Sequence, residues 1–526
     1  MSLDLAIRGG TVIDGDGGPG YEADVGIEGG RIVEIGRLSE PHAPTVLDAS
    51  ACFVAPGFID MHSHVEESLL AGESLEPKLR QGVTLEVMGQ DGIGLAPAPH
   101  GTKELIARTY STWSGTGSEL DWGWSSVGEL LDRLDGGETN GVLLVPHGNL
   151  RMAAARLEDR DVREGELDEM RRELAHALQQ GAAGLSTGLT YLPCMFASTS
   201  ELIALCEVVA ASDGYFSPHH RGYGIGAIEC YLECDEICRA SGASVHLTHA
   251  VLEYDENAGR ADEILRIVDR ARADGYDMTL DTYPYTAGVS NLASFLPAWA
   301  QEGGHDPTMQ RLTDDSALNA IRRDMLDGRI PTHTPIDWEV LVLSSVDHPR
   351  HREWVGSSLA RVGELSGLDP FGCFVDLLIE NHLTAQVLEF AADEQNVRAL
   401  LPHARHMVGS DGTLQGSRPH PRAWGAFARF LGRYVRDLGL LPWEEAIRKI
   451  TSLPADTVGI RDRGRVAVGN HADIAVFEPG SVIDTATYDH PASLAAGMRH
   501  VLVNGEPAIE AERSTARRAG RALRVG

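Results

Sequence analysis

Lysine occurs only three times in this 526-residue chain, and several other features are missing altogether. No apolar run approaches the ~20 residues that a membrane-spanning helix needs. The N-terminus lacks the charged and apolar segments of an export signal. The seven cysteines are an odd number without framework spacing, which indicates reduced thiols. These absences predict a cytoplasmic protein that does not bind membranes.

The chain also has no excess of basic over acidic residues. The formal net charge is −32, which repels phosphate backbones, so the sequence predicts no nucleic-acid partner. An apolar content of 43% and a charged content of 23% are typical of a globular protein. At 526 residues, one large domain with a smaller one attached is expected. The charge does not identify a substrate, and a small-molecule substrate and a homo-oligomer are both compatible with it.

The two ends of the chain carry short strand patterns. Residues 1–58 alternate apolar and polar positions between glycine-rich turns, which predicts a small antiparallel sheet. A similar pattern returns within residues 466–526. Because domain termini often lie close together, we expect both segments to form a single β-sandwich.

The middle of the chain, residues 59–465, repeats an apolar strand followed by a helical stretch. Eight such strands predict an α/β fold, a closed (β/α)8 barrel of the TIM type. The last connection is far longer than an ordinary crossover. Residues 286–345 are therefore expected to form an inserted subdomain, between strands seven and eight, over the barrel mouth.

Polar residues follow four of the predicted strands, where barrel enzymes build their sites. In a strand, positions two apart face the same side, so the two imidazoles of the first motif point together. Neutral imidazoles and carboxylates converging on one place suit zinc or a similar divalent ion. The four strand ends read Asp60-Met-His62-Ser-His64, Pro218-His219-His220-Arg221, His246-Leu-Thr-His249 and Gly409-Ser-Asp411-Gly412.

Longer motifs carry a specific resemblance. Ala55-Pro-Gly-Phe-Ile-Asp-Met-His62-Ser-His64 resembles the first-strand motif of the amidohydrolase superfamily. Within it, three further segments resemble the D-aminoacylases, which are N-acyl-D-amino-acid deacylases. These segments are Gly181-Ala-Ala-Gly-Leu-Ser-Thr-Gly-Leu-Thr-Tyr191-Leu-Pro193, Asp281-Thr-Tyr-Pro-Tyr-Thr-Ala-Gly288, and Ser410-Asp-Gly with Pro419-His-Pro-Arg-Ala-Trp-Gly425. The matches follow the family order along nearly the whole chain.

The resemblance implies roles for the site residues. It implies that His219 and His249 hold a tightly bound metal, most simply zinc, while His62 and His64 belong to a second, weaker site. It also implies that Asp411, counted with the metal-site residues, is the catalytic carboxylate. A carboxylate in that place can take a proton from the attacking water and later protonate the leaving nitrogen. The expected activity is metal-dependent hydrolysis of an amide C–N bond.

Two positions depart from the family pattern. The family's second-strand cysteine ligand falls on Asp91, a harder oxygen donor that should change metal affinity. A lysine that helps to hold the substrate carboxylate is replaced by Val251. The resemblance places four other side chains at the substrate pocket, and an anionic substrate remains compatible with them. These residues are Tyr191, Arg221, Tyr283 and Arg422.

The scarcity of lysine excludes one subtype of the superfamily. Many of these barrel hydrolases bridge two metals with a carbamylated lysine on the fourth strand, where this chain reads Gly184-Leu-Ser-Thr187. Two alternatives stay open. The departures at Asp91 and Val251 leave room for a cyclic amide, carbamate or formamide as substrate. A non-catalytic interaction protein on the same fold is the other alternative, although such proteins typically lose metal ligands.

Overall fold

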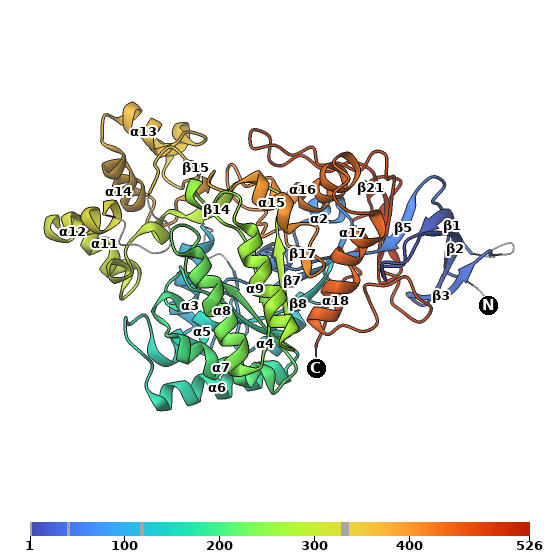
Figure 1. Cartoon of the computed structure of the whole chain (residues 1–526), viewed down its shortest axis with the longest axis horizontal. Coiled ribbons are helices and arrows are strands. Elements are labelled where there is room, and N and C mark those ends of the chain that lie inside the picture. Colours follow the sequence, from blue (N-terminus) through green and yellow to red (C-terminus); the bar gives the residue numbers. More distant parts are fainter. Residues whose placement is uncertain (1–2, 39–42, 116–119, 328–335, 526) are drawn as a thin grey trace.

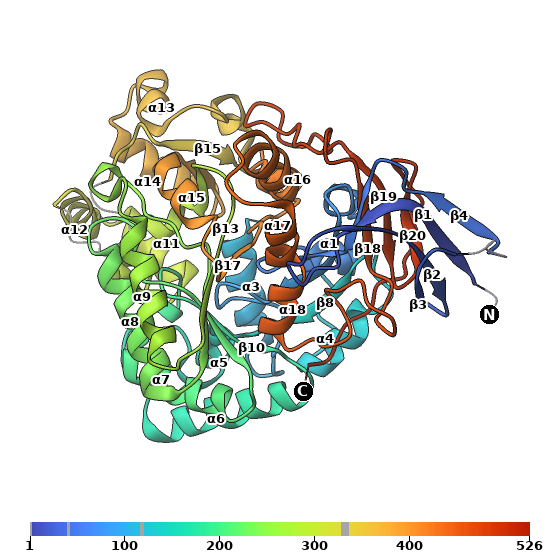
Figure 2. The same cartoon turned by 45° about the vertical axis from the view of Figure 1, so that its right-hand side comes forward.

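The computed structural model describes residues 3–38, 43–115, 120–327 and 336–525. Figures 1 and 2 show a strand-rich end, a central body in which helices surround strands, and a mainly helical lobe on the far side. Segments from the start and the finish of the chain, blue and red, lie together in the strand-rich end. No helix within the described ranges has the length and apolar character to cross a membrane.

One sheet combines strands from both ends of the chain. Strand β5 (Phe53–Pro56) pairs antiparallel with β18 (Ile474–Phe477), and Val54 lies opposite Val476 with both side chains buried. The strand order is β21-β20-β19-β18-β5-β1-β2-β3, with β4 paired to β1. The remaining strands are β1 (Leu5–Val12), β2 (Tyr21–Glu28), β3 (Arg31–Gly36), β4 (Thr45–Asp48), β19 (Met498–Val503), β20 (Glu506–Glu510) and β21 (Arg513–Ser514).

The central body contains two parallel sheets, with the orders β6-β7-β8 and β17-β13-β12-β11-β10-β9. Every residue of β7, β10, β11 and β13 is buried, as expected for parallel strands that are covered on both faces. Their bounds are β6 (Phe58–Asp60), β7 (Val83–Met88), β8 (Asn140–Leu143), β9 (Val145–Pro146), β10 (Gly184–Gly188), β11 (Tyr215–His219), β12 (Ser244–Leu247), β13 (Met278–Thr282) and β17 (His406–Val408).

The two parallel sheets touch at the edge that β6 shares with β17. The Met61 amide donates to the Val408 carbonyl at 3.4 Å, and Ser63 forms an isolated parallel bridge with Gly412. Across the described strands these contacts do not complete a hydrogen-bonded ring, so the expected closed barrel is replaced by two sheets. The reason is strand length, because β6 and β17 contain three residues each.

Amphipathic helices cover the outside of the central sheets. Helix α9 (Ala261–Ala273), for example, buries Ile264, Ile267 and Val268 at helical spacing and exposes charged residues on its other side. The other helices of this region are α1 (Glu66–Ala71), α2 (Glu76–Leu79), α3 (Lys103–Ser114), α4 (Val127–Leu134), α5 (His147–Ala155), α6 (Glu164–Gln179), α7 (Thr199–Ala210), α8 (Ala227–Ser241), α15 (Glu394–Leu400), α16 (Arg422–Arg429), α17 (Trp443–Ile450) and α18 (Ser452–Val458).

The helical lobe lies between β13 and β17 in the chain. Its antiparallel sheet has the order β14-β16-β15, formed by β14 (Gly288–Asn291), β15 (Leu341–Ser345) and β16 (Gln386–Glu389). The lobe has a hydrophobic cluster of its own, and its sheet reaches beyond residue 345, the predicted end of the insertion. Its helices are α10 (Ala298–Gln301), α11 (His305–Thr313), α12 (Asp315–Leu326), α13 (Leu359–Ser366) and α14 (Pro370–Glu380).

Candidate metal centre and its cavity

Two histidines follow the short strand β6. His62 and His64 are two positions apart in the segment that bends after β6, and their ring centroids are 5.0 Å apart. Their Nε2 atoms are 3.1 Å apart. His62 is fully buried and His64 is nearly so. Two ring nitrogens facing each other at this distance are arranged like ligands of a common cation.

Asp91 lies between this histidine pair and a second one. Its Oδ1 atom is 3.4 Å from His62 Nε2, and its Oδ2 atom is 3.5 Å from His64 Nε2. The backbone of Asp91 has φ of +56°, a left-handed conformation that is costly for a residue with a side chain and is often found at functional sites. The next residue, Gly92, leaves no room for a β carbon, which would lie 2.5 Å from the Gly188 nitrogen.

The second histidine pair comes from neighbouring parallel strands. His219 ends β11, and His249 follows β12 by two residues. His219 Nδ1 lies 3.0 Å from His249 Nε2, and these atoms are 3.6 Å and 3.4 Å from Asp91 Oδ1. Asp281 accepts the His249 amide at 2.6 Å and lies 2.9 Å from His246 Nε2. His246 therefore supports the loop and does not face the centre.

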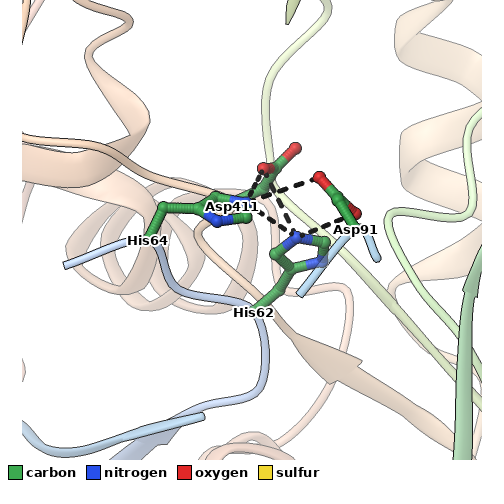
Figure 3. Close-up of side chains that lie close together, drawn as sticks. All are labelled: His62, His64, Asp91 and Asp411. Atoms are coloured by element: carbon green, nitrogen blue, oxygen red, sulfur yellow. Dashed lines mark hydrogen bonds and ion pairs between the residues drawn. The ribbon is translucent and has the colours of Figure 1, made fainter. Parts of the chain in front are cut away.

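Asp411 completes the first group. It follows β17, and its Oδ1 atom lies 3.2 Å from His64 Nε2 and 3.5 Å from His62 Nε2 (Figure 3). Its other oxygen is 2.8 Å from Arg422 Nη1. The donor atoms form two overlapping groups, each within 4.8 Å, and Asp91 belongs to both. The groups are His62, His64, Asp91 and Asp411, and Asp91, His219 and His249.

The electrostatics of the centre follow from this packing. Burial would raise the pKa of Asp411, but Arg422 and the nearby histidines hold it well below its usual range. Burial would lower the pKa of His64, yet hydrogen bonds to Asp411 and Asp91 raise it to about 10. Burial dominates at His219 and lowers its pKa to about 4. Asp411 is therefore ionised at neutral pH and His219 is neutral, as a metal ligand must be, whereas His64 would have to release its proton to bind an ion.

The centre opens into a cavity, and most of the predicted substrate-binding residues line it. Tyr191, Tyr283 and Arg422 line it, together with His64, His219 and His249. The Arg422 guanidinium also lies over the Tyr283 ring at 4.5 Å. Arg221 is not among the lining residues, because its side chain pairs with Glu233 at 3.0 Å and donates to backbone carbonyls.

His220, the neighbour of His219, points elsewhere. Its ring lies between those of Tyr223 and Tyr231, each with a centroid distance of 4.2 Å. Both of its ring nitrogens are buried without a hydrogen-bond partner. Burial lowers its pKa well below the usual value. His219, and not its neighbour His220, is therefore the residue of this motif that faces the centre.

Sequence reasoning missed the outer wall of the cavity. That wall includes Trp113 from α3, Asn291 from β14, Gln386 from β16 and Glu253 from the loop after β12. Two of these residues come from strands of the insertion that lie about a hundred positions apart and meet only in the folded chain. Glu253 alone had a local signal, since it is an acid that closely follows the His249 motif.

Comparison with known proteins gives a consistent result. An N-acyl-D-glutamate deacylase of Alcaligenes xylosoxydans xylosoxydans is 38% identical over 99% of this chain and 96% of that protein. The crystal structure of N-acyl-D-glutamate deacylase from Bordetella bronchiseptica, complexed with zinc and a phosphonate inhibitor that mimics the tetrahedral intermediate, has a TM-score of 0.84, 32% identity and full coverage of both chains.

A D-aminoacylase structure, described by the role of its binuclear metal centre, has a TM-score of 0.83 and 33% identity over 99% of each chain. The resemblance predicted from the motifs is thereby confirmed. The pattern of the Amidohydrolase family matches residues 45–509 of this sequence. This match, together with the full-length relatives, shows that the chain belongs to the amidohydrolase family.

Proposed function

We propose that this chain is a metal-dependent deacylase of N-acyl-D-amino acids. The observation that carries the proposal is the position of Asp91, whose carboxylate touches imidazoles of both histidine pairs, with Asp411 beside them. The relatives that match over the full chain are named as deacylases of this kind. The substrate is then a small molecule that enters the cavity above the centre.

The donor set fits a divalent metal. Asp91 Oδ1 is buried without a hydrogen-bond partner although four ring nitrogens surround the carboxylate. A buried, unpaired carboxylate oxygen is costly, and a cation removes that cost. His219, His249 and Asp91 would hold one ion, and His62, His64, Asp91 and Asp411 would hold a second. Imidazole and carboxylate ligands suit zinc, the ion of the Bordetella bronchiseptica relative.

The chain's own groups complete the chemistry. A bound divalent ion would polarise the substrate carbonyl and acidify the attacking water. Asp411 accepts the proton of that water and returns it to the leaving nitrogen. Arg422, 2.8 Å from Asp411, keeps this carboxylate ionised and oriented. Tyr191 and Tyr283 line the cavity and position the substrate, with Arg422, whereas Arg221 stays a prediction with no support from its position.

The finer architecture belongs to the same proposal. Leu144 alone separates β8 from β9, and its amide donates to the Met88 carbonyl at 2.9 Å. We therefore count β8 and β9 as one strand of the barrel. With the Met61–Val408 contact on the other side, we propose that the parallel sheets act as one (β/α)8 barrel over residues 59–465. The terminal segments 1–58 and 466–526 would form the β-sandwich, and residues 286–345 part of the insertion. All seven cysteines are free, which supports a reducing, cytoplasmic location.

A second candidate substrate class has one observation in its favour. Arg422 is the only arginine or lysine among the described residues that line the cavity, and it already contacts Asp411. Val251 adds no charge at the place where relatives, by the sequence resemblance, carry a lysine. A neutral cyclic amide, carbamate or formamide would need no further cation. Hydrolysis of such compounds is therefore the alternative function.

The test is a hydrolysis screen with the zinc-loaded protein. We expect release of free amino acid from N-acetyl-D-amino acids and little from their L-enantiomers. The Asp411→Asn variant, prepared identically, controls for contaminating hydrolases. Turnover of hydantoins or carbamates without turnover of any N-acyl-D-amino acid would replace the deacylase proposal with the alternative.

A further inference from the structure

The buried carboxylate of Glu253, in the outer wall of the cavity, interacts electrostatically with a second buried carboxylate, that of Glu389. Glu253 lies in the loop after β12, and Glu389 ends β16, where it pairs across the sheet with Gly288. Glu253 is 5% exposed and Glu389 is 1% exposed. The chain near Glu253 is fixed by its amide, which donates to the Tyr223 carbonyl at 3.0 Å, and by a bridge to Ala392.

The two carboxylates differ in the hydrogen bonds that they accept. Glu389 Oε1 accepts a hydrogen bond from the Tyr254 hydroxyl at 2.6 Å. Glu253 Oε2 is buried without any hydrogen-bond partner. Burial and the charge of Glu389 both raise the pKa of Glu253, and no nearby cation opposes them. A carboxylate desolvated in this way is destabilising unless another group pairs with it.

Glu253 belongs to the cavity that contains the metal centre. A β carbon on Gly288 would lie 3.3 Å from the Tyr283 hydroxyl and 3.7 Å from Glu253 Oε1. The bare glycine therefore leaves these two polar groups side by side and unobstructed. Tyr283 in turn contacts Arg422, which contacts Asp411. Glu253 and Asp411 thus line the same cavity, and Tyr283 and Arg422 line it as well.

Apart from Arg422, the charged side chains around this part of the cavity are acidic. Apart from the candidate metal-site residues, the charged side chains that line the cavity are Glu67, Glu253 and Arg422. The charge of Arg422 is shared with Asp411. Val251, which lines the cavity near Glu253, is apolar. Because its pKa is raised, Glu253 would hold a proton without a partner, whereas an ammonium or guanidinium group beside it would lower that pKa and pair with the ionised carboxylate.

We infer that Glu253 is a specificity-determining residue that binds an ammonium or guanidinium group of the substrate. This inference rests on the proposed deacylase function and names its substrate class, which is N-acyl-D-amino acids with a basic side chain. The substrate supplies the cation that the wall of the cavity lacks. A charge-assisted hydrogen bond in a desolvated place discriminates strongly against substrates that cannot form it.

The experiment compares three substrates of similar length with the zinc-loaded enzyme: the Nα-acetyl derivatives of D-lysine, D-norleucine and D-glutamate. We expect kcat/KM to fall in that order, with the lysine derivative preferred over norleucine by about ten- to hundred-fold, the range for a hydrogen bond between charged groups. In Glu253→Gln this lysine-to-norleucine ratio should collapse towards one. Glu256→Gln, the same change at an exposed position three residues away, should keep the wild-type ratio.

Each contrary result has a distinct meaning. Preference for the glutamate derivative, reduced by Glu253→Gln, would show that Glu253 is protonated and donates to an anion, which overturns the inference. An unchanged ratio in Glu253→Gln overturns it as well. If no derivative is hydrolysed, the deacylase proposal fails first. Calorimetric binding of D-lysine and D-norleucine then decides the inference, which requires tighter binding of D-lysine to wild type and equal binding to Glu253→Gln.

Discussion

The inner and outer walls of the cavity are built in different ways. The inner wall consists of residues at the ends of parallel strands, and its histidines and carboxylates converge within hydrogen-bonding distances. The outer wall consists of loop residues and of strands from the insertion, and it carries a buried carboxylate without a partner. We therefore expect the strand ends to carry the reaction, and the insertion and loops to select the substrate.

The largest effect on activity is expected when Asp411, the proposed proton carrier of the inner wall, is replaced. Asp411→Asn should lower kcat by about two to four orders of magnitude for every substrate, the range of general acid–base catalysis. Zinc in the group of Asp91, His219 and His249 should stay near that of wild type, because Asp411 does not belong to that group. Steady-state kinetics and metal analysis measure both quantities. Asp255→Asn, an exposed carboxylate, is the matched control, and normal turnover in Asp411→Asn would move the role to another group.

A second prediction concerns the carboxylate shared by the two histidine pairs. Asp91→Asn should weaken zinc binding by at least about ten- to hundred-fold, the loss seen for groups that merely hydrogen-bond to ligands. Asp91→Cys should restore tight zinc binding and disfavour manganese, because thiolate is the softer donor. Competition with a chromophoric chelator measures the affinities. Equal zinc binding by wild type and Asp91→Asn would remove Asp91 from the metal site.

The outer wall should respond differently. Val251→Lys places a cation beside Glu253 and should lower the kcat/KM ratio of the D-lysine to the D-glutamate derivative by about ten-fold or more, the value of a charge-assisted hydrogen bond. Metal content should not change. Val251→Met, which adds bulk without charge, is the control. A loss of zinc in Val251→Lys would show that the two walls are not independent.

The smallest effect is expected at His220. Its ring is enclosed by two tyrosines and turned away from the centre. His220→Phe keeps a ring of similar size, and kcat should change by less than about an order of magnitude, below the ~10²–10⁴ of a general acid or base. A larger fall in kcat with unchanged zinc content would make His220 the proton carrier instead of Asp411.

The difference between the inner and outer walls also explains which site residues could be predicted from the sequence. His62, His64, His219, His249 and Asp411 each follow a buried apolar run, and parallel strand ends meet at one edge of a sheet. Their convergence therefore followed from local pattern. Asp91 was found only through the family resemblance, because its loop uses a left-handed backbone that no hydrophobic period indicates.

The outer wall could not be predicted from local pattern. Gly288 and Glu389 become neighbours only because β14 pairs with β16 across the insertion. Arg221 lies beside His219 in the sequence, but its guanidinium pairs with Glu233, so its role in substrate binding stays a prediction. The expected closed barrel also required a complete ring of paired strands. The three-residue strands β6 and β17 are too short to complete it. Long-range pairing and side-chain direction decide these features.

The central claim is that the inner wall works through a bound metal. Its most direct measurement is kcat/KM for an N-acetyl-D-amino acid before chelation, after complete removal of metal, and after zinc is added back, with zinc per chain determined in each sample. Activity should fall to background as the metal is removed and return as zinc binds to the histidine and carboxylate groups. Full activity in a sample without metal would contradict it.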